Sequence, residues 1–223
     1  MRKYAVIVAG GSGQRMGSNV AKQFLLLQGK PVLWHTLNRF LNAYEDLSVI
    51  LVLPQQELQR GAEIIAMLGA EHRCEITAGG ATRFHSVKNG LQLVKEPSVV
   101  LVHDGVRCLV GTELIRRCCE TAMARGNAIP AVAATDSIRI EQDGHNSVAD
   151  RKHVRIVQTP QTFLSDILLP AFETEYSDAF TDEATVAEAA GHIIHLVEGD
   201  YANIKITRPV DLLLAEKILE DQA

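Results

Sequence analysis

A glycine-rich turn followed by two cations stands near the N-terminus. The apolar run at residues 4–9 leads directly into the string GGSG, which begins at Gly10, and Arg15 and Lys22 come shortly after it. No Asp or Glu occurs in the first 44 residues. Glycines let the chain turn tightly and leave backbone N–H groups exposed, which suits the binding of phosphate oxygens. The pattern predicts a loop that binds an anion such as a polyphosphate.

Two familiar nucleotide-binding loops do not account for this turn. The P-loop string G-x-x-x-x-G-K-[ST] is absent from the chain. The dinucleotide fingerprint needs a third glycine or alanine, and Met16 stands there instead. It also needs an acidic residue after the second strand, but the apolar run 49–53 leads into Pro54. The turn is therefore either another kind of anion-binding loop or a plain glycine turn with two solvated cations.

A second group of polar side chains follows the apolar run at residues 99–102. His103, Asp104 and Arg107 come directly after it. An Asp at the tip of a buried strand suits Mg²⁺, which keeps several waters and binds through substrate phosphates. The same Asp would also suit capping of the next turn. Arg107 either pairs with a phosphate or holds Asp104 in place, and a structural role is favoured for His103.

Two further predicted strand ends carry cations. A short strand at residues 75–77 leads through a Gly-Gly pair to Arg83, and a strand at residues 202–206 carries Lys205. Ligands of an open parallel sheet bind beyond the carboxyl ends of its strands. Cations at several strand ends therefore predict one anionic binding site along that edge.

The elements that must position these residues alternate between strand and helix. Continuous apolar strands separated by helical patterns predict an α/β fold, with a mostly parallel sheet covered by helices on both faces. The alternation is interrupted at residues 137–149, where two polar strands flank the Asp143-Gly144 turn. Because this hairpin has few apolar residues, we expect an arm that projects from the domain. The arm either meets a second subunit or is a solvated flap.

Composition limits the classes of function. The chain has 223 residues and a net charge of −5, without a basic stripe, so we expect one domain and no nucleic-acid partner. No apolar stretch reaches the roughly 20 residues of a membrane helix, and the first apolar run is too short for a signal peptide. A cytoplasmic protein without a membrane partner is expected. Its four cysteines, two of them adjacent at Cys118 and Cys119, are expected to be reduced.

Several strings occur together and in order along nearly the whole chain. They are AGGSGQRMG with AKQF, GG-x-x-R followed by Ser86, HDGVR, TPQ from Thr159, FTDEA and NIKITRP. In these strings, between about residues 4 and 220, the sequence resembles the cytidylyltransferases that act on polyol phosphates.

The resemblance implies a fold, a reaction and an assembly. The fold is a single Rossmann-like nucleotidyltransferase domain over residues 1–223, with a β-arm at 136–152 that makes a homodimer. The reaction transfers a cytidylyl group from CTP to 2-C-methyl-D-erythritol 4-phosphate, in the non-mevalonate route to isoprenoid precursors, with Mg²⁺ as cofactor. Alternatives are ribitol 5-phosphate as acceptor, a sugar-1-phosphate nucleotidyltransferase, and a nucleotide-binding module without catalysis.

The resemblance also assigns roles to individual residues. The expected catalytic cations are Arg15, Lys22 and Lys205, and the expected metal ligand is Asp104. The expected CTP-binding residues are Gly10, Gly11, Ser12, Gly13, Gly80, Ala81, Arg83, Ser86 and Arg107. The expected polyol-phosphate-binding residues are Ser137, Arg151 and Thr181, with Arg151 reaching the neighbouring subunit.

Two positions depart from the family pattern. Ala81 stands where relatives often carry an acidic residue beside the base, so base recognition is expected to rest on backbone groups. Cys108 replaces the usual proline after HDGVR. Neither change removes a cation or the metal ligand, so activity is expected to survive.

Overall fold

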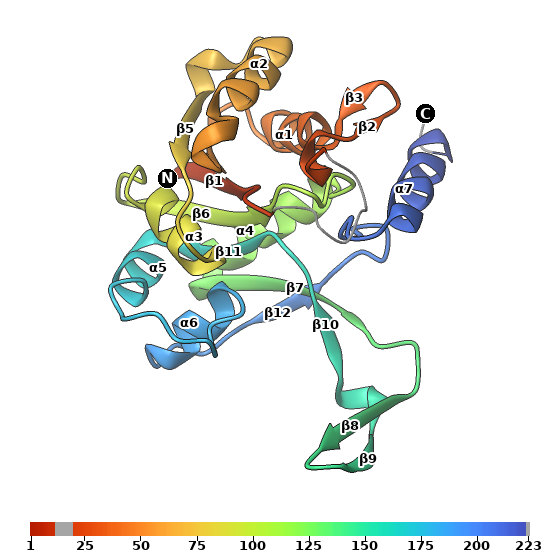
Figure 1. Ribbon diagram of the computed structural model, residues 1–223. Coiled ribbons are helices and arrows are strands. Elements are labelled where there is room, and N and C mark those ends of the chain that lie inside the picture. Colours follow the sequence, from red (N-terminus) through yellow and green to blue (C-terminus); the bar gives the residue numbers. More distant parts are fainter. Residues whose placement is uncertain (12–19, 222–223) are drawn as a thin grey trace.

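An eight-stranded, mostly parallel sheet forms the centre of the protein (Figure 1). The structure is a computed structural model and describes residues 1–11 and 20–221. The strand order is β10-β7-β11-β6-β1-β4-β5, and β12 also pairs with β7. The strands are β1 (Arg2–Val8), β4 (Leu47–Leu53), β5 (Cys74–Ala78), β6 (Ser98–Asp104), β7 (Asn127–Ala133), β10 (Arg155–Val157), β11 (Gln161–Leu164) and β12 (Leu196–Glu198). The predicted α/β architecture is confirmed.

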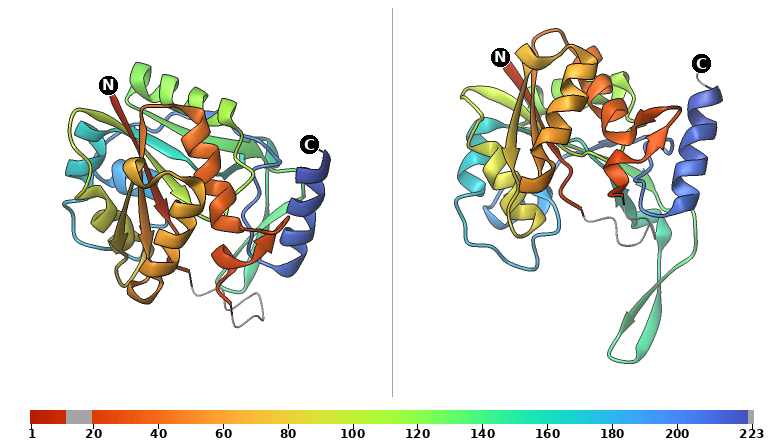
Figure 2. Two further views of the ribbon diagram at one scale, coloured as in Figure 1. Left: turned by 90° about the horizontal axis from the view of Figure 1, so that it is seen from above. Right: turned by 45° about the horizontal axis from the view of Figure 1, so that its top comes forward.

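Helices cover both faces of this sheet (Figure 2). One face carries α1 (Val32–Ala43), α2 (Leu58–Leu68) and α4 (Thr112–Arg125). The other carries α3 (Arg83–Leu91), α5 (Ser165–Ala171) and α6 (Glu183–Ala189). At one end, α7 (Pro209–Asp221) packs near the small hairpin of β2 (Leu26–Leu27) and β3 (Lys30–Pro31). No helix in the described ranges is long and apolar enough to cross a membrane.

The central strand β1 is apolar on both sides because both faces of the sheet are covered. Ala5 and Ile7 pack in one core, whereas Val6 and Val8 pack in the other. The parallel register pairs Val8 with Val52 of β4 and with Asp104 of β6. The carboxyl ends of these three strands therefore lie level, and the residues that follow β1 and β6 meet at one edge.

The expected projecting arm is present. Strands β8 (Ile138–Gln142) and β9 (His145–Ala149) form a separate two-stranded sheet, closed by a turn with positive φ at Asp143 and Gly144. The arm extends away from the main sheet between β7 and β10 (Figures 1 and 2). A 3-10 turn, η5 (Arg151–His153), leads back toward β10.

Two sequence-based assignments were wrong. Residues 202–206 form no strand, so Lys205 lies in the connection between β12 and α7. Ile206 does donate its N–H to the Val106 carbonyl at 3.0 Å, but its side chain packs in the apolar cluster beside α7. The second error concerns β11, which was not expected and which runs antiparallel between β6 and β7.

Candidate active site

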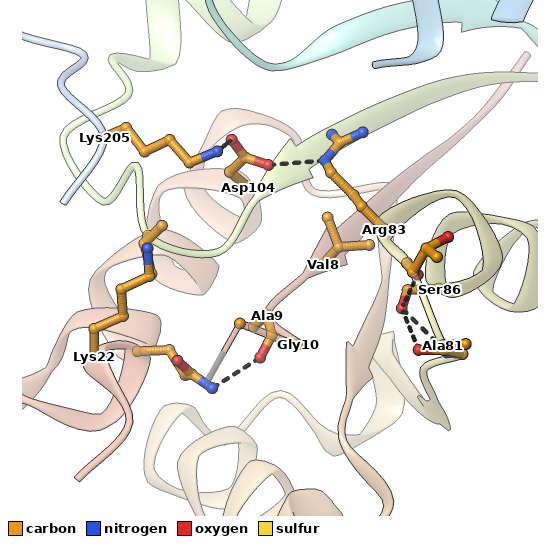
Figure 3. A pocket seen from close by; sticks show the side chains of 14 residues that line it. Val8, Ala9, Gly10, Lys22, Ala81, Arg83, Ser86, Asp104 and Lys205 are labelled. Atoms are coloured by element: carbon orange, nitrogen blue, oxygen red, sulfur yellow. Dashed lines mark hydrogen bonds and ion pairs between the residues drawn. The ribbon is translucent and has the colours of Figure 1, made fainter. Parts of the chain in front are cut away.

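A cavity of about 320 Å³ opens beyond the carboxyl ends of β1, β5 and β6. Figure 3 shows Lys22, Asp104 and Lys205 on one side of it, with Ala81 and Ser86 on the other. The predicted site residues that line it are Gly10, Gly11, Lys22, Gly80, Ala81, Arg83, Ser86, Asp104 and Lys205. The structure therefore brings together nine residues from the glycine turn, the short helix at residues 22–24, the β5–α3 loop with the first turn of α3, the end of β6 and the segment after β12.

Asp104 lies among three cations. Its Oδ2 lies 2.8 Å from Lys205 Nζ and 3.7 Å from Arg107 Nε, and its Oδ1 lies 3.3 Å from Arg83 Nε. Burial alone would raise the pKa of Asp104, but the charges of Arg83 and Lys205 hold it well below its usual range. The carboxylate is therefore ionised and able to bind cations.

Arg83 is shared between two carboxylates. Its Nη1 and Nη2 contact the two carboxylate oxygens of Glu183 at 2.5 and 3.1 Å, while its Nε faces Asp104. Burial opposes the charge on Arg83, but Glu183 and Asp104 raise the pKa of the guanidinium above its ordinary value. Burial raises the pKa of Glu183, and Arg83 opposes that shift. This bidentate geometry fixes the guanidinium plane.

The backbone of Asp104 is held by a buried hydroxyl. Its N–H donates to Thr159 Oγ1 at 3.1 Å, and Thr159 Oγ1 lies 2.9 Å from His103 Nδ1. A carbonyl oxygen can only accept, so His103 Nε2–H donates to the Arg107 carbonyl at 3.1 Å, and in the neutral imidazole Nδ1 is left to accept from the Thr159 hydroxyl. Burial lowers the pKa of His103 to about 3, so its imidazole is neutral. The structural role favoured for His103 agrees with these contacts.

Arg107 lies behind Asp104 and outside the cavity lining. Its Nη1 donates to the Asn203 carbonyl at 2.8 Å, and the buried Asn203 side chain donates to the Thr159 carbonyl at 2.9 Å. Of the two interpretations left open for Arg107, these contacts favour the one in which it holds Asp104 in place.

The loop between β5 and α3 is shaped by Ser86. Its Oγ accepts from the Gly80 N–H at 3.1 Å and donates to the Thr82 carbonyl at 2.9 Å. A Cβ at Gly80 would collide with the Cβ of His85, so glycine is required there. A hydroxyl has one donor and two acceptor positions, so one acceptor position of Ser86 remains for a ligand in the cavity.

Lys22 and Gln23 approach from the short helix η2 (Lys22–Phe24). The Lys22 side chain lines the cavity, and Gln23 Nε2 donates to the Ala9 carbonyl at 2.8 Å. Gln23 thereby ties η2 to the start of the glycine turn. Ser12, Gly13 and Arg15 lie outside the described residues.

The three predicted polyol-phosphate residues do not line the cavity. Ser137 and Arg151 are exposed at the base of the arm, where Arg151 donates to the Thr135 carbonyl at 2.7 Å. Thr181 is exposed just before α6. Their roles remain predictions.

Four residues of the site were given no role from the sequence: Gln23, Thr159, Glu183 and Asn203. All four lie in strings quoted above, which are AKQF for Gln23, TPQ for Thr159, FTDEA for Glu183 and NIKITRP for Asn203, but the strings do not assign them a role. The sequence carries no signal for the pairing of Glu183, because the full burial that makes its carboxylate need a cationic partner is seen only in the structure. Gln23 and Asn203 act through backbone carbonyls, for which no sequence signal exists.

The sequence of this chain is similar to those of known proteins over nearly its whole length. The sequence matches the family described as 2-C-methyl-D-erythritol 4-phosphate cytidylyltransferase over residues 4–221. The chain belongs to this family. Cytidylyltransferases of this name from Bacteroides fragilis and Bacteroides thetaiotaomicron are 45% and 44% identical to it, over 98% of this chain and 100% of their own. The chain is thus a nucleotidyltransferase by family.

Solved structures support the same assignment. The 4-diphosphocytidyl-2C-methyl-D-erythritol synthase from Anaerococcus prevotii aligns with a TM-score of 0.85 at 27% identity, covering 98% of this chain and 96% of that one. The 2-C-methyl-D-erythritol 4-phosphate cytidylyltransferase from Thermus thermophilus aligns with a TM-score of 0.72 at 30% identity, covering 96% and 98%. The similarity therefore covers the whole cytidylyltransferase fold.

Proposed function

We propose that this protein transfers the cytidylyl group of CTP to 2-C-methyl-D-erythritol 4-phosphate, releasing pyrophosphate, in the non-mevalonate route to isoprenoid precursors. The observation that carries the proposal is the ionised Asp104 among three cations, in a cavity walled by a glycine turn. Family membership supplies the chemical identity of donor and acceptor. We further propose that the whole chain acts as one domain.

The reaction needs charge stabilisation more than proton transfer. A phosphate oxygen of the acceptor attacks the α-phosphorus of CTP, and the bond to the pyrophosphate oxygen breaks. A phosphate monoester is already an anion at neutral pH, so no general base is required. Repulsion between two anions and the charge developing on the transferred group must be offset by fixed cations. Lys22 and Lys205 line the cavity and carry such charges, and Arg15 is assigned the same role.

Asp104 suits a divalent metal such as Mg²⁺. The described residues contain no cluster of three or more His, Cys, Asp or Glu that would form an all-protein metal site. Mg²⁺ commonly binds through one or two carboxylates plus substrate phosphates, which fits a single ionised carboxylate facing a nucleotide cavity. When bound, the ion offsets charge on the phosphates and on the leaving group.

The remaining roles divide the site into a nucleotide half and an acceptor half. The backbone around Gly80 and Ala81, together with the open acceptor position of Ser86, is assigned to the cytosine edge. The acceptor is assigned to Ser137, Arg151 and Thr181. Because Ser137 and Arg151 stand at the base of the arm and outside the cavity, we propose that a second subunit completes the acceptor half.

The arm is the proposed dimer contact. In its register Ile140 pairs with Ser147, and Ile138 pairs with Ala149, so these four residues share one face. Ile140 is 57% exposed in the single chain. We expect Ile140→Lys to convert a dimer to a monomer in sedimentation velocity, while Glu141→Lys on the opposite face does not. A wild-type monomer would contradict this assembly.

The activity is tested by measuring pyrophosphate release. CTP, UTP, ATP and GTP are each paired with methylerythritol phosphate or ribitol 5-phosphate in the presence of Mg²⁺. Turnover with CTP and methylerythritol phosphate alone is the expected result. Turnover with ribitol 5-phosphate would replace the acceptor and keep the chemistry, and silence in every pairing would refute the proposal.

A further inference from the structure

The three cations around Asp104 differ in what else holds them. Arg83 is fixed from outside the cavity by Glu183, and Arg107 by the Asn203 carbonyl. For Lys205, the part of the chain that the structure describes offers its Nζ one partner, Asp104 Oδ2 at 2.8 Å. Two of the three cations are therefore anchored, and the third is held by the carboxylate itself.

Lys205 also has the most exposed side chain of the three cations. Its side chain is 40% exposed, compared with 30% for Arg83 and 12% for Arg107. Its backbone is fixed on both sides, because Asn203 donates to Thr159 and Ile206 donates to Val106. A flexible four-carbon stem on a fixed backbone lets the ammonium group turn into the cavity without other bonds being broken.

We propose that the Lys205 ammonium group binds the Asp104 carboxylate at the place where a divalent cation binds when the nucleotide arrives, so that the cation replaces Lys205. Glu183 is the positioning residue that keeps Arg83 out of this exchange. The inference rests on the proposed function and adds an order of events to it. Lys205 releases Asp104 and turns to the phosphates as the nucleotide and the metal enter together.

The charges of the cluster explain why the metal enters with the nucleotide. Asp104 and Glu183 contribute at most two negative charges, and Arg83, Arg107 and Lys205 contribute three positive ones, so the cluster is already net positive. A free divalent cation would add two more positive charges at a carboxylate already bound to Lys205. A triphosphate brings the compensating negative charge and offers Lys205 a new partner.

Glu183 determines which of the three cations is replaced at Asp104. It is fully buried at the first position of α6, and Gln161 fixes that turn by accepting from the Ala184 N–H and donating to Asp182. Without the Glu183 carboxylate, Asp104 would be the one carboxylate of the described residues left to pair with the Arg83 guanidinium, which lies 3.3 Å from it. Arg83 would then compete for Asp104 even when Lys205 has turned away.

The test is a titration of the nucleotide-free protein with Mn²⁺, in which electron paramagnetic resonance measures the free ion. Lys205→Met keeps the stem and removes the charge, and we expect it to bind Mn²⁺ about tenfold more tightly than wild type, the scale of one charge-assisted hydrogen bond. Adding Asp104→Asn should abolish the gain, and adding Glu183→Gln should reduce it. Lys22→Met, which removes another charge of the cavity lining, is the matched control and should change affinity less than twofold.

The outcomes separate the parts of the inference. An affinity in Lys205→Met equal to or weaker than wild type, or an equal gain in Lys22→Met, would refute the exchange. Lys205→Met/Glu183→Gln binding as tightly as Lys205→Met would refute the role of Glu183. Circular dichroism establishes that each variant is folded, and Glu183→Asp replaces Glu183→Gln if the latter does not fold, with the same expected direction.

A second titration distinguishes this inference from the proposed function. It uses Mn²⁺ with a CTP analogue that carries a methylene bridge between the α- and β-phosphates. Weaker binding in Asp104→Asn supports the metal role of Asp104 and leaves the exchange to be decided by the first titration. Unchanged binding would overturn that metal role and the exchange with it.

Discussion

The Thr159 hydroxyl should be worth more to this protein than an ordinary threonine hydroxyl. It accepts from the Asp104 N–H and donates to His103 Nδ1, and all three residues are buried. Thr159→Val keeps the shape of the side chain and removes the oxygen, which leaves one donor and one acceptor stranded. Each stranded buried group costs about 1–3 kcal/mol, so the two together should lower the free energy of unfolding by about 2–6 kcal/mol. That is a large share of the roughly 5–15 kcal/mol of a typical domain.

Urea unfolding followed by circular dichroism measures this loss. With a urea dependence of about 3 kcal/mol per molar for a chain of this size, the midpoint should drop by about 0.7–2 M. Turnover should also fall, because the backbone that carries Asp104 is no longer fixed. Thr159→Ser is the matched control, since it keeps the oxygen and should unfold close to wild type. Equal midpoints for the valine and serine variants would refute the reasoning.

Three further predictions follow from the same structure. Lys22→Ala and Lys205→Ala should each lower turnover by about 10²–10³-fold with unchanged circular dichroism, and near-wild-type rates would remove the assigned role. Gly90→Ala should destabilise the protein by about 1–3 kcal/mol, because the added Cβ would lie 2.7 Å from Val6 Cγ1. Gly111→Ala is the control, since its Cβ would meet nothing within 4 Å. Equal urea midpoints for the two variants would contradict this prediction. Burial raises the pKa of Cys118 and Cys119 to about 12. Their reaction with a disulfide reagent should therefore be slow at pH 8 and become faster as the pH rises. Fast labelling of the folded protein at pH 8 would contradict this, because it would show that these thiols are accessible.

The residues that could be predicted are those whose signal is local. The glycine turn and Asp104 each follow a buried apolar run, and parallel strands place such positions at one edge. Lys205 was placed in the right site but in the wrong element. Ile204 and Ile206 flank it as they would in a strand, but the two isoleucines pack in the cluster beside α7 instead of pairing in the sheet.

The residues that could not be predicted act through partners far away in sequence. Glu183 meets Arg83 across 100 positions, and Thr159 meets Asp104 across 55. Each partner has an ordinary alternative, such as a cap or a solvated charge, so the sequence alone gives no reason to pair them. The antiparallel β11 was missed for a similar reason, since a four-residue strand is fixed by its neighbours on both sides.

The hydrogen bonds beneath the cavity also determine at what stage of folding the site forms. They join residue 104 to 159, 159 to 203, and 107 to 203, over separations of 55, 44 and 96 positions. Contacts this distant form slowly, because long loops must close before such contacts contribute. A chain emerging from the ribosome carries its glycine turn and Asp104 long before Thr159 and Asn203 are made. Nucleotide binding should therefore be a late event in biosynthesis, acquired only after the final third of the chain has docked.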